Sequence, residues 1–201
     1  MNKKIGFWGS SLNLAAVICF AISLIAGSAY AGYLSSTFIA LGFMAMTCAY
    51  AHYADEKRKA AGYLAAILSA AYAVLIFIVY FAQMTAVQFG NLSDSAMNVL
   101  DYSTFGLMFT YDLVGYALMA LATVFAGLTI EPKNKADKWL KALLLIHGVF
   151  FLSCFFMPLF NVFSTESAGS SSIGTSLLEF WCAYFTPIGI LSMLHFRKKS
   201  E

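Results

Sequence analysis

The sequence predicts an all-α, polytopic membrane helical bundle with six transmembrane helices. Hydrophobic residues make up 61% of the chain and charged residues 11%, a balance far more apolar than that of soluble domains. Six apolar stretches are each long enough, at about 20 residues, to cross a hydrocarbon core roughly 30 Å thick as helices. Strands are disfavoured because these stretches lack an alternating polar pattern, and a bilayer offers no water to free backbone groups. Residues 1–201 are therefore predicted to form one integral membrane domain, with spans near 12–31, 34–53, 61–83, 105–130, 140–163 and 173–196.

The basic residues fall on alternate connections, and this pattern indicates the orientation. All twelve lie before the first stretch, after the second, after the fourth or after the sixth. They are Lys3, Lys4, Lys57, Arg58, Lys59, Lys133, Lys135, Lys138, Lys141, Arg197, Lys198 and Lys199. The intervening connections carry Asp94, Asp101 and Glu166 instead. Because Lys and Arg near short loops are retained on the cytoplasmic side, both termini are predicted to be cytoplasmic.

The first stretch has two possible fates. Lys3 and Lys4, followed by LNLAAVICFAISLIAGSAYA, resemble a secretory signal with an A-x-A cleavage site at Ala29 to Ala31. The apolar part is longer than the usual signal core, which favours a retained first helix. Cleavage would leave five spans with the same loop orientation.

The third connection, residues 84–104, is the longest. Its sequence, MTAVQFGNLSDSAMNVLDYST, leaves two interpretations open. One is a short interfacial helix capped at Ser93, with Met97, Val99 and Leu100 as its apolar side. The other is a plain loop.

Two prolines predict kinks in the last two helices. Pro158 lies in the fifth stretch and Pro187 in the sixth. A proline inside a helix removes one backbone hydrogen bond and frees a carbonyl, which a neighbouring helix must satisfy or which lines a cavity.

Asp112 and Glu179 are the two acids inside the predicted spans. Each lies roughly five or six residues from the predicted outer end of its helix, about 8 to 9 Å at 1.5 Å per residue, so the two share a level. Such acids normally face the bundle interior or water, because an uncompensated central aspartate costs roughly 2.5–3.5 kcal/mol. In a purely structural explanation, Asp112 hydrogen-bonds a neighbouring helix and Glu179 extends to the interface beside Trp181.

Other polar side chains are predicted at the same level as Asp112. Tyr80 and Gln83 end the third stretch, Tyr116 lies one turn below Asp112, and Asn161 ends the fifth stretch. Together these residues predict a polar pocket that opens outward, with Asp112 as its principal charged group.

The histidines do not predict a metal or haem site. His52 and His195 lie at predicted cytoplasmic helix ends, and His147 lies about two turns inside the fifth stretch. Their spacing matches no metal motif, and no carboxylate is expected at their depth. We expect interfacial anchoring for the first two and a helix-contact hydrogen bond for His147, with no cofactor.

Three stretches, IGFWGS, AAYAVLIFIVYFAQMTAV and TYDLVGYALMALATVFAGL, resemble a family of small multi-pass membrane proteins of bacteria and archaea that has a domain of unknown function. In that family a similar tyrosine-and-glutamine helix end precedes an aspartate-led D-x-x-G-Y helix, here Asp112 to Tyr116. The resemblance spans most of the chain and implies a membrane domain of about six helices. It implies no activity and no catalytic residue.

The sequence favours a non-enzymatic protein of the cell membrane that binds or moves a small solute or a proton. The predicted site lies between the third, fourth and sixth helices and comprises Asp112, Glu179, Gln83, Tyr80 and Tyr116. A nucleic-acid partner is not expected, because the basic clusters are short and lie at helix ends. Two alternatives stay open: a lipid-modifying enzyme with Asp112 and Glu179 as acid and base, and an assembly or regulatory protein whose polar residues only specify packing. The oligomeric state is open as well.

The orientation predicts that cysteines on opposite connections differ in reactivity. In a cysteine-free background, Ser95→Cys and Ser170→Cys should react with an impermeant thiol reagent applied to intact cells, whereas Asn134→Cys should not. Labelling of Asn134→Cys together with protection of Ser95→Cys would overturn the orientation.

Overall fold

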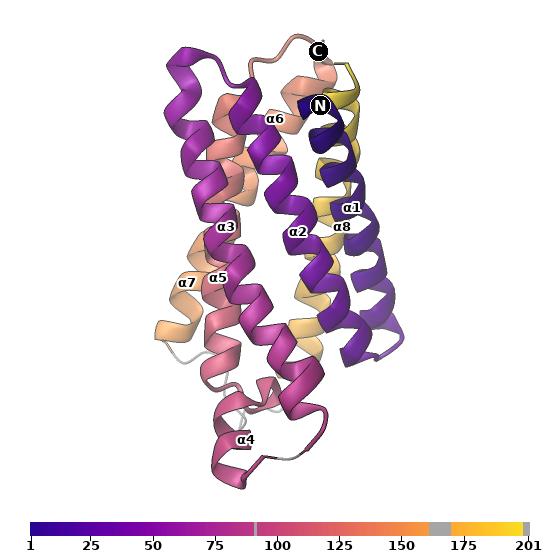
Figure 1. Ribbon diagram of the computed structural model, residues 1–201, viewed down its shortest axis with the longest axis vertical. Coiled ribbons are helices and arrows are strands. Elements are labelled where there is room, and N and C mark those ends of the chain that lie inside the picture. Colours follow the sequence, from indigo (N-terminus) through magenta and orange to yellow (C-terminus); the bar gives the residue numbers. More distant parts are fainter. Residues whose placement is uncertain (91, 161–169, 199–201) are drawn as a thin grey trace.

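The computed structural model describes residues 1–90, 92–160 and 170–198, without the side chains of 170–173, and these residues form a bundle of antiparallel helices (Figure 1). Six helical segments are long and apolar enough to cross a membrane, and the described residues contain no strand, so the predicted fold class is confirmed. The helices are α1 (Asn2–Ile25), α2 (Ala29–Tyr53), α3 (Lys59–Ala82), α4 (Asp94–Leu100), α5 (Leu107–Thr129), α6 (Lys135–His147), α7 (Val149–Leu159) and α8 (Ser170–Arg197).

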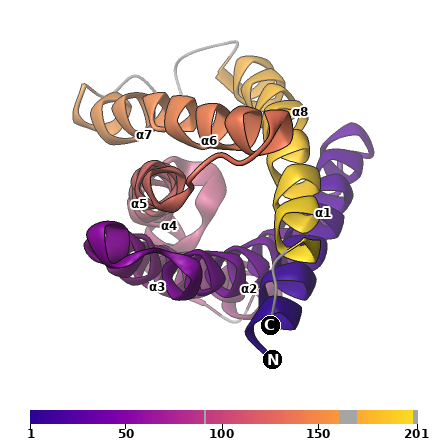
Figure 2. The ribbon, with the colours of Figure 1, turned by 90° about the horizontal axis from the view of Figure 1, so that it is seen from above.

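The helices pack largely in chain order. α1 contacts α2 and α8, α2 contacts α3, and α3 contacts α5. Seen along the long axis, α5 lies between α3 and the pair formed by α6 and α7 (Figure 2). α8 completes the bundle by packing mainly on α1 and α6.

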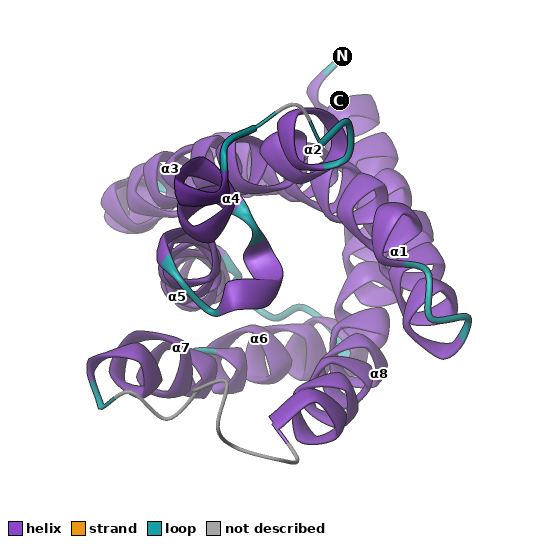
Figure 3. Cartoon of the chain, turned by 90° about the horizontal axis from the view of Figure 1, so that it is seen from below, coloured by secondary structure: helices purple, strands orange, loops and turns teal. Residues whose placement is uncertain are grey.

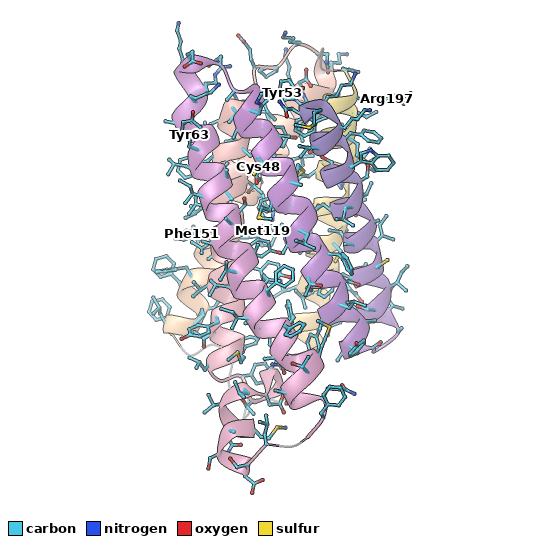
Figure 4. All side chains as sticks on the ribbon, in the orientation of Figure 1. Cys48, Tyr53, Tyr63, Met119, Phe151 and Arg197 are labelled. Atoms are coloured by element: carbon cyan, nitrogen blue, oxygen red, sulfur yellow. The ribbon has the colours of Figure 1, made fainter. Side chains whose placement is uncertain are left out.

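Apolar side chains cover both the inside and the outside of this bundle. Met119 is fully buried, whereas Tyr63 is 57% exposed on the outer surface of α3 (Figure 4). Trp8, Ile67 and Leu152 are exposed in the same way. A surface this apolar is suited to contact with lipid chains.

The turn between the first two helices lies earlier than predicted. α1 ends at Ile25 and α2 begins at Ala29, so the first helix covers residues 2–25 and not 12–31. Gly27 adopts a φ of +65°, and the Ser28 side chain caps α2 by accepting a hydrogen bond from the Ala31 amide. The apolar run continues through this tight turn, which is why hydropathy alone placed the boundary too late.

The interruption of the fifth span lies at Gly148 and not at Pro158. Pro158 is one residue from the end of α7, so almost no helix follows it. At Gly148 the chain touches α5 closely, because an added Cβ would lie 2.3 Å from Cγ2 of Val124. Pro187 lies within α8, which continues as one helix on both sides of it.

The third connection contains the short helix that the sequence left open. Its residue Ser93 caps α4 by accepting a hydrogen bond from the Ala96 amide. A π-helical turn, η2 (Gln83–Val87), precedes α4, and a 3₁₀ turn, η3 (Tyr102–Thr104), follows it. Seen from the α4 end, this segment lies across the ends of α3 and α5 (Figure 3).

The basic connections gather at the opposite end of the bundle from α4. The start of α1, the end of α8 and the α2–α3 and α5–α6 connections lie together there (Figure 1). Nη1 of Arg58 lies 3.7 Å from a carboxylate oxygen of Glu131 and joins these two connections. Nδ1 of His195 lies 2.8 Å from Oδ1 of Asp137 and joins the end of α8 to α6. The basic clusters that alternate along the sequence therefore lie at one end of the folded bundle, and α4 lies at the other.

The close approach of α1 and α2 predicts a sensitive glycine. In Gly42→Ala, the added Cβ would lie 2.5 Å from the backbone nitrogen of Asn13 and 2.8 Å from its Cα. Backbone atoms cannot rotate away, so the variant should lose about 1–3 kcal/mol of stability, measured as thermal unfolding in detergent. In the matched control Gly115→Ala, the nearest atom is Cδ1 of Ile76 at 3.4 Å, an ordinary contact, so its stability should be unchanged. Equal losses in the two variants would contradict the packing described here.

Candidate functional site

Asp112 is a buried carboxylate in the second turn of α5. Only 3% of the residue is exposed. Its Oδ2 accepts a hydrogen bond of 2.9 Å from the Tyr102 phenol, whereas Oδ1 is buried with no hydrogen-bond partner among the described residues. Burying a polar atom without a partner is costly, so the second oxygen marks a place where a ligand or a proton would be favourable.

Gln83 holds the backbone that carries Tyr102. Its Nε2 donates to the Leu100 carbonyl at 2.8 Å, and its Oε1 accepts from the Tyr102 amide at 3.0 Å. Both ends of the buried amide are therefore occupied by the connection. Gln83 positions the phenol above Asp112 and does not itself face a ligand.

Tyrosine rings surround the phenol of Tyr102. Tyr33 and Tyr80 stack with ring centroids 5.3 Å apart, and Tyr102 lies 6.1 Å from each of them. Burial raises the pKa of Tyr102 well above its usual value, and the nearby Asp112 carboxylate raises it further, so this phenol stays protonated and remains a donor. The phenol of Tyr80 also lies near the carboxyl, although its geometry does not complete a hydrogen bond to Oδ1.

A cavity of about 270 Å³ lies beside Asp112, between α5, α7 and α8. Aromatic side chains form much of its wall, and the residues that carry the argument below are Phe109, Tyr116, His147, Phe150 and Trp181. The Tyr116 hydroxyl is buried without a hydrogen-bond partner among the described residues, as is Oδ1 of Asp112. Two of the residues that line this largely apolar cavity, Asp112 and Tyr116, thus each carry a polar atom without a partner among the described residues.

His147 lines the same cavity but is fully engaged. The indole nitrogen of Trp181 donates to its Nε2 at 2.9 Å, and its Nδ1 lies 2.9 Å from Oγ1 of Thr123. Because the indole can only donate, Nε2 must accept and the proton belongs on Nδ1. The predicted helix-contact role fits this geometry. Asp112 and His147 both line the cavity, and the expectation that no carboxylate lies at the depth of His147 stays a prediction. No cluster of three metal-ligating side chains occurs among the described residues.

Glu179 lies outside this cavity. It is exposed on α8, and the cavity-lining positions of that helix are Gly174, Thr175, Leu177, Leu178 and Trp181. Four of these five, all but Thr175, follow the i, i+3, i+4, i+7 spacing of one helical face, and Glu179 itself does not line the cavity. Equal depth in the membrane therefore did not bring the two acids to one site.

Of the remaining predicted site residues, Tyr80 and Tyr116 lie close to Asp112, and Gln83 acts through Tyr102. Asn161 falls outside the described residues. Sequence reasoning missed Tyr102 and Trp181. The i, i+3, i+4, i+7 spacing in the sixth stretch would have indicated Trp181, but Tyr102 depends on the fold of the connection and had no comparable signal.

The chain matches no family model, curated protein or solved structure. The resemblance to small multi-pass membrane proteins of bacteria and archaea accordingly stays a prediction.

The role of Gln83 can be tested by removing its two hydrogen bonds to the connection. Gln83→Leu retains the volume but leaves the Leu100 carbonyl and the Tyr102 amide unpaired, at about 1–3 kcal/mol each. We expect faster amide hydrogen exchange over residues 100–104, measured by mass spectrometry. Thr85→Ala is the control, because the Thr85 hydroxyl bonds only to the Phe81 carbonyl of its own helix. If Gln83→Leu leaves the exchange rate unchanged, Gln83 does not hold the connection.

Proposed function

We propose that this protein binds a small solute within the membrane, in the cavity between α5, α7 and α8, with Asp112 as the polar group that holds it. The observation that carries the proposal is that Asp112 lines the cavity and that its buried Oδ1 has no hydrogen-bond partner among the described residues. An ionisable group inside a membrane span is costly to keep and is by default a functional candidate.

A purely structural role for Asp112 has less support. If Asp112 served only to hold helices together, its carboxylate would pair with a neighbouring spanning helix. The hydrogen bond that Asp112 forms goes instead to Tyr102 in the adjoining connection. Asp112 also lines a volume that the described side chains do not fill.

The lipid-modifying enzyme has less support as well. It requires Asp112 and Glu179 at one substrate, whereas Glu179 is exposed outside the cavity. His147 could not replace Glu179 as a base without breaking its bonds to Trp181 and Thr123.

The proposal includes the orientation that the basic residues predict. With the basic end in the cytoplasm, α4 and the Tyr102 connection lie on the outer side of the cell membrane. The carboxyl of Asp112 then lies in the outer half of the bundle, which favours loading of the cavity from outside.

Asp112→Asn separates binding from packing. The variant keeps the size of the side chain and an acceptor for Tyr102, and loss of an intramembrane charge generally eases insertion, so it should remain folded. We expect Asp112→Asn to lose the stabilisation that a panel of small solutes gives the wild type, measured as thermal unfolding in detergent. We also expect it to lose the flux of these solutes into proteoliposomes. Glu179→Gln makes the same chemical change outside the cavity and should behave as the wild type. A loss of thermal stability in Asp112→Asn, with solute responses unchanged, would contradict the proposal.

A further inference from the structure

We infer that the ligand of this cavity is a small organic cation with one compact apolar or aromatic body. The inference rests on the proposed function and narrows it to one charge class. Three features of the described residues support it: the missing counter-ion of Asp112, the aromatic wall and the size of the cavity.

Asp112 has no cationic partner among the residues that the structure describes. Every described lysine and arginine lies at the end of the bundle opposite α4, and the ion pairs of Arg58, Lys59 and His195 lie there too. His147, the nearest basic side chain in the cavity, is held neutral by the indole of Trp181 on Nε2. A positive charge from the ligand would therefore supply the counter-ion that the chain lacks.

The cavity wall suits a cation in a second way. Tyr116 and Trp181 meet edge to face with ring centroids 5.8 Å apart, and Phe109 and Phe150 add further rings from α5 and α7. Aromatic faces attract cations through their quadrupole, most strongly where water is excluded. An anion is less suited, because the Trp181 and Tyr102 donors are already used, which leaves the Tyr116 hydroxyl, and because the nearest charge is a carboxylate.

Cavity size limits the ligand. Pockets for drug-sized molecules measure roughly 300–1,000 Å³. At about 270 Å³ this cavity is smaller, so it fits one ring with a small ammonium group and not a cation with several rings.

A proton would compete with such a cation for the same oxygen. Without ligand, a proton on Oδ1 neutralises the carboxyl, and cation binding releases that proton to water. The titratable groups around the carboxyl are the phenols of Tyr33, Tyr72, Tyr80, Tyr102 and Tyr116, the Cys154 thiol, the His147 imidazole and, further away, Asp101 and the exposed Glu179. Of these, only Asp112 combines burial in the cavity with an unpaired carboxylate oxygen, so lower pH should weaken cation binding.

The test compares three probes of one shape on the full-length protein in detergent. They are benzyltrimethylammonium, its uncharged isostere neopentylbenzene, and the anion benzylsulfonate. Affinities follow from thermal unfolding and from tryptophan fluorescence, since Trp181 lines the cavity. The cation should bind about tenfold or more tightly than the isostere, the advantage expected of a charge-assisted contact, and the anion should not bind.

Variants and pH assign this preference to Asp112. In Asp112→Asn the cation should lose about tenfold in affinity while the isostere is unaffected, and Glu179→Gln should match the wild type. In the wild type, acidification should lower the affinity for the cation and not the affinity for the isostere. This measurement does not depend on whether a variant folds.

The outcomes separate the two proposals. Equal binding of the cation and the isostere to the wild type would overturn the charge class and leave solute binding in the cavity intact. A cation preference that survives in Asp112→Asn would overturn the role of Asp112 in both proposals. If none of the three probes binds to the wild type, the inference and the proposed function both fail.

Discussion

The hydrogen bond from the Tyr102 phenol to the Asp112 carboxylate is the contact on which the α4 half of the bundle depends. A carboxylate that is 3% exposed in a low-dielectric interior needs partners, and this phenol is the one that the structure gives it. Because the phenol comes from a connection, that connection must hold a fixed conformation. Gln83 fixes it through two backbone hydrogen bonds. A polar requirement inside the membrane thereby orders the segment outside the spans.

Two polar centres border the cavity, and they differ in how completely they are satisfied. Both nitrogens of His147 are paired, so this residue joins α5, α6 and α8 and has no free position for a ligand. Asp112 has one oxygen paired and one open. A polar centre with all its hydrogen bonds formed adds rigidity. A centre with one unpaired oxygen retains the cost of burying that oxygen, and a proton or a ligand would offset this cost. This contrast directs any solute toward Asp112.

The sequence could predict those parts of the fold that a single physical rule decides. The length of each apolar run gave the six spans, and the cost of a buried charge singled out Asp112. It could not decide features that depend on two rules at once. The turn at Gly27 lies inside an apolar run, and the place of Glu179 required the helical face as well as the depth. Tyr102 was beyond reach, since its position follows from bonds to Gln83 and Asp112 that exist only in the folded chain.

The cavity exists because the fifth span changes its packing partners at Gly148. α6 packs on α5 and α8, whereas α7 follows α5 alone among the major helix contacts. An uninterrupted helix would have to run in one direction while it packed on both α5 and α8. With the interruption, α7 stays on α5 while α8 packs on α1 and α6, so the described parts of α7 and α8 do not close the space between them by helix packing. Leu177, which borders this space, remains 45% exposed on the apolar surface of the bundle. A ligand with an apolar body could therefore reach Asp112 from the lipid as well as from water, and its charged group would be the part that stops at the carboxylate.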